Sequence, residues 1–130
     1  MKQETPSSSA PIDILLVDDD DELRRAMIDL LASDDHSAVG VSNGVEALAW
    51  LGAAERAPRL ILLDLMMPVM DGWQFRKEQL ADPVLASIPV AVLSARGNEP
   101  LDDGVEVLKK PIRPQLLLDF VARRFGKSAT

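Results

Sequence analysis

Acidic side chains follow two apolar runs of the sequence, at the points where each run ends. Four consecutive aspartates, residues 18–21, come directly after the run Ile14–Val17, and Asp64 comes directly after residues 60–63. Because the carboxyl ends of parallel strands meet at one edge of a sheet, we expect these carboxylates to converge on one pocket. Such an anionic pocket suits a divalent metal ion and a carboxylate that forms an acyl phosphate. The sequence therefore points to phosphoryl chemistry.

The composition is that of a small single domain. The chain has 130 residues, 47% of them hydrophobic, which is enough for one core. We expect the domain at residues 12–125, between a disordered tail at 1–11 and a short tail at 126–130. The chain has no cysteine, which excludes disulfides and cysteine nucleophiles and indicates a cytoplasmic protein. The net charge of −7 argues against nucleic-acid and membrane partners.

Strand and helix patterns alternate along the chain. Short apolar runs predict five buried strands, at residues 12–17, 37–41, 60–63, 90–93 and 105–108. Helical spacing of apolar residues follows every strand except the fourth. Asn43 and Pro114 are typical of helix starts, and Pro83 must lie beyond a helix end. The alternation predicts an α/β protein with a doubly wound parallel sheet.

The fourth connection is unusually short. Only eleven residues, 94–104, separate the fourth and fifth expected strands, whereas a parallel crossover usually takes about a dozen or more. Gly97, Pro100 and Gly104 within it also oppose helix formation. We therefore expect the fourth helix to be truncated.

Four motifs stand in order at the ends of successive apolar runs. They are ILLVDDD at 14–20, LDLMMPVMDG at 63–72, VLSA at 92–95 and KKP at 109–111. In this order they resemble the receiver domains of bacterial two-component response regulators, over residues 12–125. The resemblance implies a flavodoxin-like sheet of order 2-1-3-4-5 with helices on both faces. It also implies a phosphoacceptor of a two-component system or phosphorelay, which catalyses only its own phosphorylation and dephosphorylation.

The resemblance makes Asp64 the phosphoacceptor. It would take a phosphoryl group from a sensor histidine kinase or a histidine phosphotransfer protein. Asp18 and Asp19 would hold Mg²⁺, with Asp64 and the backbone carbonyl of Met66 as further ligands. Asp20, like Asp21 after it, is instead expected to start a helix, because acidic groups are favoured at helix N-termini.

Ser94 and Lys110 complete the site that the resemblance implies. The Ser94 hydroxyl would donate to one phosphoryl oxygen, while Lys110 would neutralise another and pair with Asp64 before phosphorylation. Lys110 is preferred to Lys109 because it directly precedes Pro111, and in the family that bond is usually cis.

Three residues bear on signalling and on the lifetime of the acyl phosphate. Val107 stands where receivers usually carry an aromatic residue whose ring reports phosphorylation, and a β-branched valine has few rotamers with which to do so. Met66 and Arg96 occupy positions that in the family border the path of the attacking water. A long apolar chain and a cation there predict slow self-dephosphorylation.

The expected partners are proteins. Besides the phosphodonor, we expect a downstream protein target, with the chain acting as a monomer or weak homodimer. Only five residues follow Phe125, so the chain, if complete, would be a stand-alone receiver.

Two other functions fit part of the sequence. The string Val17–Asp20 also resembles the start of haloacid-dehalogenase-like phosphatases, with Asp18 as nucleophile and Asp20 as acid, but this leaves Asp64 unexplained. A degenerate receiver that only binds a partner would lack the acceptor, a metal acid or the lysine, and all are present.

His36, the sole histidine, lies in a polar segment and is expected on the surface.

Overall fold

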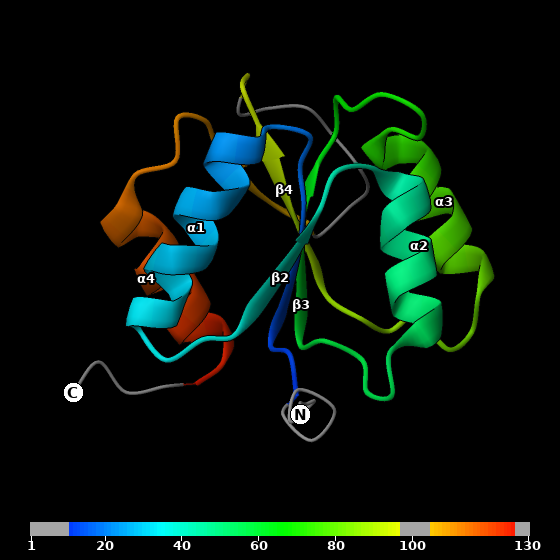
Figure 1. The fold of residues 1–130 in the computed structure, drawn as a ribbon, viewed down its shortest axis with the longest axis horizontal. Helices are drawn as coiled ribbons and strands as arrows, with labels where there is room; N and C mark the ends of the chain where they lie inside the picture. The colour runs from blue at the N-terminus through cyan, green and yellow to red at the C-terminus, as the bar shows by residue number, and fades with distance from the viewer. Residues whose placement is uncertain (1–10, 97–104, 127–130) are drawn as a thin grey trace, which may run out of the picture.

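The computed structural model describes residues 11–96 and 105–126. Its five strands are β1 (Ile14–Val17), β2 (Ala38–Val41), β3 (Leu60–Asp64), β4 (Val90–Ser94) and β5 (Glu106–Lys109). They form one parallel sheet in the order β2-β1-β3-β4-β5, seen nearly edge-on in Figure 1. This order confirms the predicted flavodoxin-like, doubly wound sheet.

Four helices cover the two faces of the sheet in the described part of the chain. They are α1 (Asp21–Ser33), α2 (Gly44–Ala53), α3 (Gly72–Ala81) and α4 (Pro114–Arg124). Figure 1 shows α1 and α4 on one face and α2 and α3 on the other. The expected truncated helix falls on residues 97–104, and the expected tails fall mainly on 1–10 and 127–130, all outside the described residues.

The three central strands are almost entirely apolar, as expected for a parallel sheet that helices cover on both faces. Every residue of β1, β3 and β4 is buried. Alternate residues of β1 point to opposite sides: Ile14 and Leu16 pack with α1 and α4, whereas Leu15 and Val17 pack with α2 and α3. No helix among the described residues has the length and apolar character needed to cross a membrane.

Acidic and amide side chains fix where three helices begin. The side chains of Asp20, Asn43 and Asp71 accept hydrogen bonds from Leu23 N, Glu46 N and Gln74 N, at 3.0, 2.9 and 2.9 Å. Each bond satisfies a backbone donor that has no partner within its helix. The prediction that Asp20 starts a helix is therefore confirmed.

The expectation for His36 was wrong. Only 1% of His36 is exposed, and its ring meets the Phe125 ring edge to face with 5.3 Å between ring centres. Its polar sequence neighbours suggested a surface loop. The end of the last helix, nearly ninety positions away in the sequence, covers it instead.

Candidate functional site

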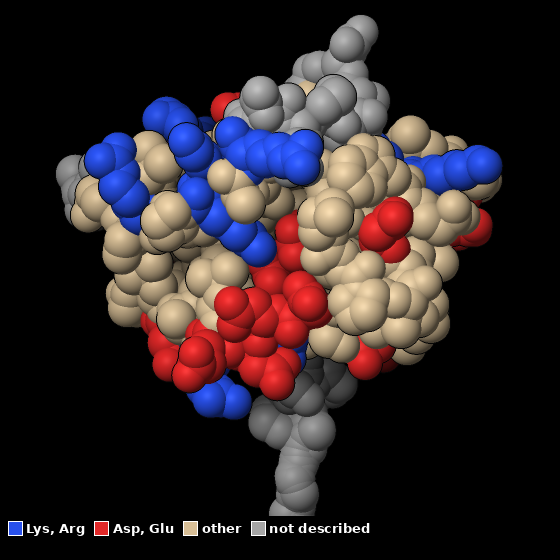
Figure 2. Space-filling model, turned by 90° about the horizontal axis from the view of Figure 1, so that it is seen from above, with Lys and Arg blue, Asp and Glu red and all other residues tan. Residues whose placement is uncertain are grey.

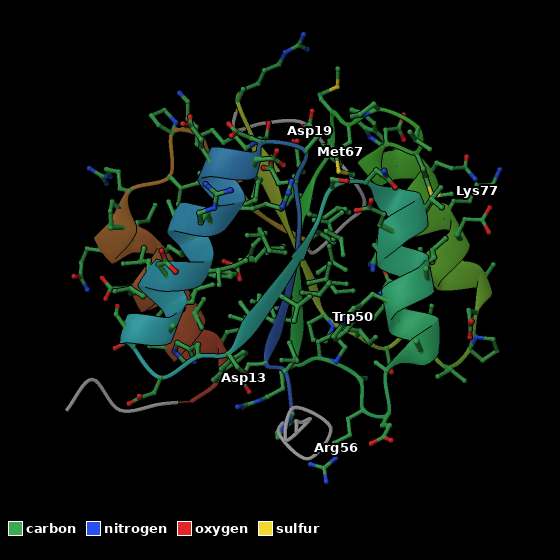
Figure 3. The ribbon with its side chains drawn as sticks, viewed as in Figure 1. Asp13, Asp19, Trp50, Arg56, Met67 and Lys77 are labelled. Carbon is green, nitrogen blue, oxygen red and sulfur yellow. The ribbon has the colours of Figure 1, made fainter. Side chains whose placement is uncertain are left out.

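The carboxyl-terminal ends of four strands bring the predicted site residues to one edge of the sheet. Asp18 follows β1, Asp64 ends β3, Ser94 ends β4 and Lys110 follows β5. Figure 2 looks down on this edge, where acidic side chains gather beside a band of Lys and Arg, and Figure 3 places Asp19 there. A cavity of about 520 Å³ opens here, lined by Asp18, Asp19, Asp20, Asp64, Met66, Ala95, Arg96 and Lys110.

Three of these carboxylates form a tight cluster. Oxygen atoms of Asp18, Asp19 and Asp64 lie within 4.8 Å of one another. Asp18 is fully buried and Asp64 is 6% exposed, while Asp19 faces solvent. Carboxylates this close repel one another unless a cation lies among them. The cluster therefore suits a small divalent cation that accepts a few carboxylate oxygens and keeps some of its waters.

Each carboxylate oxygen of the buried Asp18 has one close contact. Its Oδ1 accepts a hydrogen bond from Asp20 N at 2.9 Å, and its Oδ2 lies 2.7 Å from Lys110 Nζ. Lys110 Nζ is farther from Asp64 Oδ2, at 3.6 Å. Lys110 thus contacts Asp64 as expected, but its shorter contact is with Asp18. A fully buried carboxylate needs a compensating charge more than a partly solvated one.

The surroundings of Asp64 and Lys110 raise the pKa values of both side chains. Burial and the neighbouring Asp18 charge raise the pKa of Asp64 to about 6, although Lys110 and the Met66 N–H pull it down. Burial alone would lower the pKa of Lys110, but the hydrogen bond and charge of Asp18, together with Asp64, outweigh burial and raise it. Lys110 therefore stays charged, and Asp64 is the carboxylate with the weaker compensation.

Backbone contacts join the ends of β4 and β5 beside Asp64. Ser94 is buried, and its Oγ accepts a hydrogen bond from Arg96 N at 3.2 Å. Lys110 N donates to Ser94 O at 2.8 Å, and the Lys110–Pro111 peptide bond is cis, as expected. The hydroxyl of Ser94 and the ammonium of Lys110 are thereby positioned by neighbouring strands.

Two residues that support the site were not found by sequence reasoning. Arg24 Nη1 on α1 donates a hydrogen bond to the Asp18 carbonyl at 2.7 Å. This bond ties the segment that follows β1 to the first turns of α1. Gly72 lies against β3, where a Cβ would come within 2.6 Å of the Asp64 carbonyl oxygen. In a sequence, an Asp-Gly pair indicates only a turn or a helix start, and a single arginine within a helix indicates no particular contact.

The loop after β3 carries Met66 into the cavity. Met66 is 65% exposed, and its N–H donates to Asp64 Oδ1 at 3.3 Å. Farther along, Met70 N donates to Pro68 O at 2.8 Å, which closes a tight turn around Val69 at a φ of 71°. The loop then returns to β3 through a hydrogen bond from Gly72 N to Leu65 O at 3.0 Å.

The parallel sheet places an acidic cluster and a lysine at the rim of one cavity, an arrangement suited to phosphoryl transfer in the presence of a divalent cation. Residues 14–122 match the family of the response regulator receiver domain. The chain is 38% identical to the response regulator Rcp1 of Synechocystis over 99 residues, which are 71% of this chain and 67% of Rcp1. It is also 38% identical to Rre1 of Synechocystis over 88 residues, 67% of this chain and 37% of Rre1.

Solved structures of a response regulator and of a receiver domain have the same fold as this chain. A putative response regulator from Chloroflexus aurantiacus superposes with a TM-score of 0.78 at 25% identity, covering 91% of this chain and all of that one. The receiver domain of the sensor histidine kinase PA1611 from Pseudomonas aeruginosa, which has magnesium coordinated in its active-site cleft, gives 0.77 at 26% identity and the same coverage.

The chain therefore belongs to the receiver domain family of response regulators, the phosphoacceptors of two-component systems. It spans 37% and 30% of the lengths of two of its relatives, Rre1 and a protein-glutamate methylesterase of Geobacter metallireducens. Those relatives are longer proteins in which the matched part is one portion.

Proposed function

We propose that Asp64 accepts a phosphoryl group from the phosphohistidine of a sensor kinase or a histidine phosphotransfer protein. One observation carries this proposal: Asp64 ends a buried strand at the wall of an open cavity, with two further carboxylates within 4.8 Å and Lys110 at 3.6 Å. A carboxylate so placed is accessible to an incoming phosphoryl group and has neutralising charge beside it. We propose residues 12–125 as the extent of the domain.

Mg²⁺ fits the donor atoms of this cavity. Asp18, Asp19 and Asp64 would hold it with carboxylate oxygens, and Met66 would contribute its backbone carbonyl. The ion would supply charge neutralisation for the phosphoryl oxygens. Asp18 already carries a lysine contact in a buried environment, so this residue is suited to a cationic partner.

The protein residues divide the transfer among them. An Asp64 oxygen forms a new bond to phosphorus as the phosphorus–nitrogen bond of the phosphohistidine breaks, and the electron pair stays on the histidine ring. Lys110 moves its charge from the carboxylates towards a phosphoryl oxygen, and the Ser94 hydroxyl donates to another. Neither residue gives up a proton, so both act by electrostatic stabilisation.

The geometry does not favour Asp18 as the nucleophile of a phosphatase. Asp18 is fully buried, and both of its oxygens are engaged, one with Asp20 N and the other with Lys110. A nucleophile must be accessible to the phosphorus atom, and Asp64 is 6% exposed whereas Asp18 has no exposed surface. Asp64 is the better-placed carboxylate, which leaves the chain as a signalling phosphoacceptor that acts on its own aspartate.

Phosphorylation is proposed to signal through contacts with a downstream protein, without the usual aromatic switch. Val107 is only partly buried in β5, and its branched side chain offers no ring to reorient. The readout then falls to residues that move with the buried Ser94 hydroxyl and with the Lys110 ammonium, which lines the cavity. We place this signalling in the cytoplasm, with the chain as a monomer or weak homodimer.

Intact-mass measurement tests the proposed function. The protein is incubated with acetyl phosphate and Mg²⁺ or EDTA, beside Asp64→Asn and the matched surface variant Asp29→Asn. We expect one phosphate on the wild-type protein and on Asp29→Asn, in the presence of Mg²⁺ only, and none on Asp64→Asn. A phosphate increment on Asp64→Asn as large as that on the wild type would refute the assignment.

A further inference from the structure

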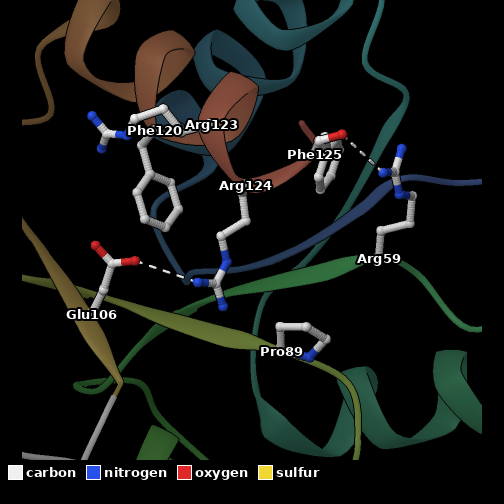
Figure 4. A pocket seen from close by; sticks show the side chains of 7 residues that line it. All are labelled: Arg59, Pro89, Glu106, Phe120, Arg123, Arg124 and Phe125. Carbon is white, nitrogen blue, oxygen red and sulfur yellow. Dashed lines mark hydrogen bonds and ion pairs between the residues drawn. The ribbon is translucent and has the colours of Figure 1, made fainter. Parts of the chain in front are cut away.

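A second cavity lies at the opposite, amino-terminal edge of the sheet. Its volume is about 400 Å³, and Figure 4 shows the side chains that line it. Arg59 reaches it from the start of β3, Glu106 from the start of β5, and Arg123 and Arg124 from the end of α4. The phosphoryl chemistry proposed above uses none of these residues.

The cavity carries an excess of positive charge. Arg124 Nη1 lies 3.3 Å from Glu106 Oε1, so these two side chains largely neutralise each other. Within residues 11–96 and 105–126, neither Arg59 nor Arg123 forms an ion pair with a carboxylate. Two uncompensated guanidinium groups thus share one cavity on a chain whose net charge is −7.

Aromatic rings restrict two of the guanidinium groups. The Arg59 guanidinium lies 4.0 Å from the centre of the Phe125 ring, and Nη2 donates to the Phe125 carbonyl at 3.5 Å. The Arg124 guanidinium lies 5.8 Å from the centre of the buried Phe120 ring. Stacking of this kind limits the orientations of a guanidinium but leaves N–H groups at its edge free to bind a carboxylate in a two-pronged manner.

The arginines are spread along the cavity and do not converge on one point. Figure 4 shows Arg59 on one side of Arg124 and Arg123 on the other. All three are exposed, and a single exposed ion pair contributes little to binding. Several carboxylates on one chain bind together far better, because the first contact raises the effective concentration of the rest. This arrangement favours an extended acidic segment over a small anion.

We infer that this cavity binds an acidic peptide segment of a partner protein, with carboxylates on Arg59 and Arg123. Glu106 repels a carboxylate placed beside Arg124, so the acidic side chains are directed to the two ends of the cavity. The segment must therefore carry at least two separated acidic residues.

This docking site is separate from the phosphoacceptor cavity. The strand β3 runs from the residue after Arg59 to Asp64, β4 runs from the residue after Pro89 to Ser94, and both are buried along their length. A strand of five residues spans on the order of 15 Å. A partner can therefore occupy the amino-terminal edge while the carboxyl-terminal edge exchanges phosphoryl groups.

Fluorescence anisotropy with a labelled hexaglutamate peptide tests the inference. We expect saturable binding at low ionic strength, and about tenfold weaker binding for the double variant Arg59→Gln/Arg123→Gln. The matched variant Arg25→Gln/Lys77→Gln removes the same charge from exposed positions on α1 and α3 and should bind as the wild type does.

Three results would overturn the inference. They are absence of saturable binding, an equal loss of affinity in both double variants, and displacement of the peptide by succinate at similar concentrations. The last result would mean that the cavity takes a small dicarboxylate. Amide shifts in the NMR spectrum of the wild-type protein provide a second readout, and peptide-induced shifts must include Phe125 and Leu60 beside the cavity.

Discussion

At the scale of single residues, one lysine contacts two carboxylates, and its unequal distances from them affect how well each negative charge is compensated. Lys110 lies 2.7 Å from the buried Asp18 and 3.6 Å from Asp64. Asp18 obtains most of the compensation because it has no access to solvent. Burial and then the charge of Asp18 raise the pKa of Asp64, and the remaining negative charge makes the site receptive to an added cation.

The raised pKa of Asp64 predicts a pH-dependent gain in stability for Asp64→Asn without metal. Ionised Asp64 is disfavoured in the folded protein, so the wild type loses stability as pH rises from 3.8 through about 6. The variant escapes this loss and should be more stable by about 1 to 2 kcal/mol above pH 6, and no more stable near pH 3.8. Urea unfolding in EDTA at several pH values measures the difference.

The surface variant Asp29→Asn is the control for this pH series, and it should follow the wild type throughout. Adding Mg²⁺ should reverse the order of stability at neutral pH, because a bound ion stabilises only the form that retains its ligands. A stability difference between wild type and Asp64→Asn that is constant from pH 4 to 8 would contradict the account.

Lys110 and a divalent cation compete for the same carboxylates, which predicts tighter Mg²⁺ binding by Lys110→Met. Removing a positive charge a few ångströms from the ion is expected to gain about 1 to 2 kcal/mol, or roughly 5- to 30-fold in affinity. Phosphorylation by acetyl phosphate should nevertheless be slower, since the phosphoryl oxygen loses its lysine. Calorimetric titration at pH 8 measures the affinity, with the exposed Lys109→Met as control. Unchanged affinity in Lys110→Met would show that the two cations do not compete.

We expect the Met66 side chain to slow hydrolysis of the acyl phosphate. Its exposed apolar side chain lines the cavity beside Asp64 and offers no hydrogen bond to an attacking water. Met66→Asn should hydrolyse its acyl phosphate several-fold faster, because an amide can position that water. Decay of the phosphorylated mass after removal of the donor gives the rate, and Val69→Asn, in the same loop but outside the cavity lining, should decay like the wild type. Equal decay of Met66→Asn and wild type would remove Met66 from this role.

At the scale of secondary-structure elements, the site depends on how closely α3 returns to β3. Gly72 begins α3, and its N–H donates to the Leu65 carbonyl just past the strand. A side chain at this position would meet the Asp64 carbonyl oxygen at 2.6 Å, which is backbone and cannot move aside easily. The start of α3 can therefore lie this close to the end of β3 only because residue 72 has no Cβ atom.

Gly72→Ala should lower both stability and activity. The clash displaces the end of β3, so we expect a loss of about 2 kcal/mol in unfolding free energy and slower phosphorylation of Asp64. Gly52→Ala in α2 is the matched control: nothing lies within 4 Å of its Cβ, and alanine should stabilise that helix by about 0.5 to 1 kcal/mol. If both alanine variants gained stability, the close approach of α3 to β3 would be disproved.

Elements with a strong local signal were the ones predicted from the sequence. The apolar runs located the ends of β1 and β3, so the positions of Asp18 and Asp64 at one edge followed directly. Contacts between distant segments were not predictable in this way. The burial of His36 depends on Phe125, and the shorter contact of Lys110 with Asp18 depends on the depth at which each carboxylate lies.

At the scale of the whole molecule, the parallel sheet places polar groups at both ends of an apolar centre. The carboxyl-terminal edge gathers acidic residues and Lys110, whereas the amino-terminal edge gathers arginines around a separate cavity. The second group was invisible in the sequence because its members come from the starts of β3 and β5 and from the end of α4, with no motif in common. The roles of the individual residues at both edges remain predictions.

The most direct test of the central claim is to locate the phosphoryl group in the chain. The protein is phosphorylated with acetyl phosphate and Mg²⁺, the acyl phosphate is reduced with borohydride to a homoserine residue, and the digested peptides are sequenced by mass spectrometry. If Asp64 is the phosphoacceptor, homoserine is expected at position 64 and unmodified aspartate at positions 18 and 19. Homoserine at position 18, with Asp64 unmodified, would contradict it.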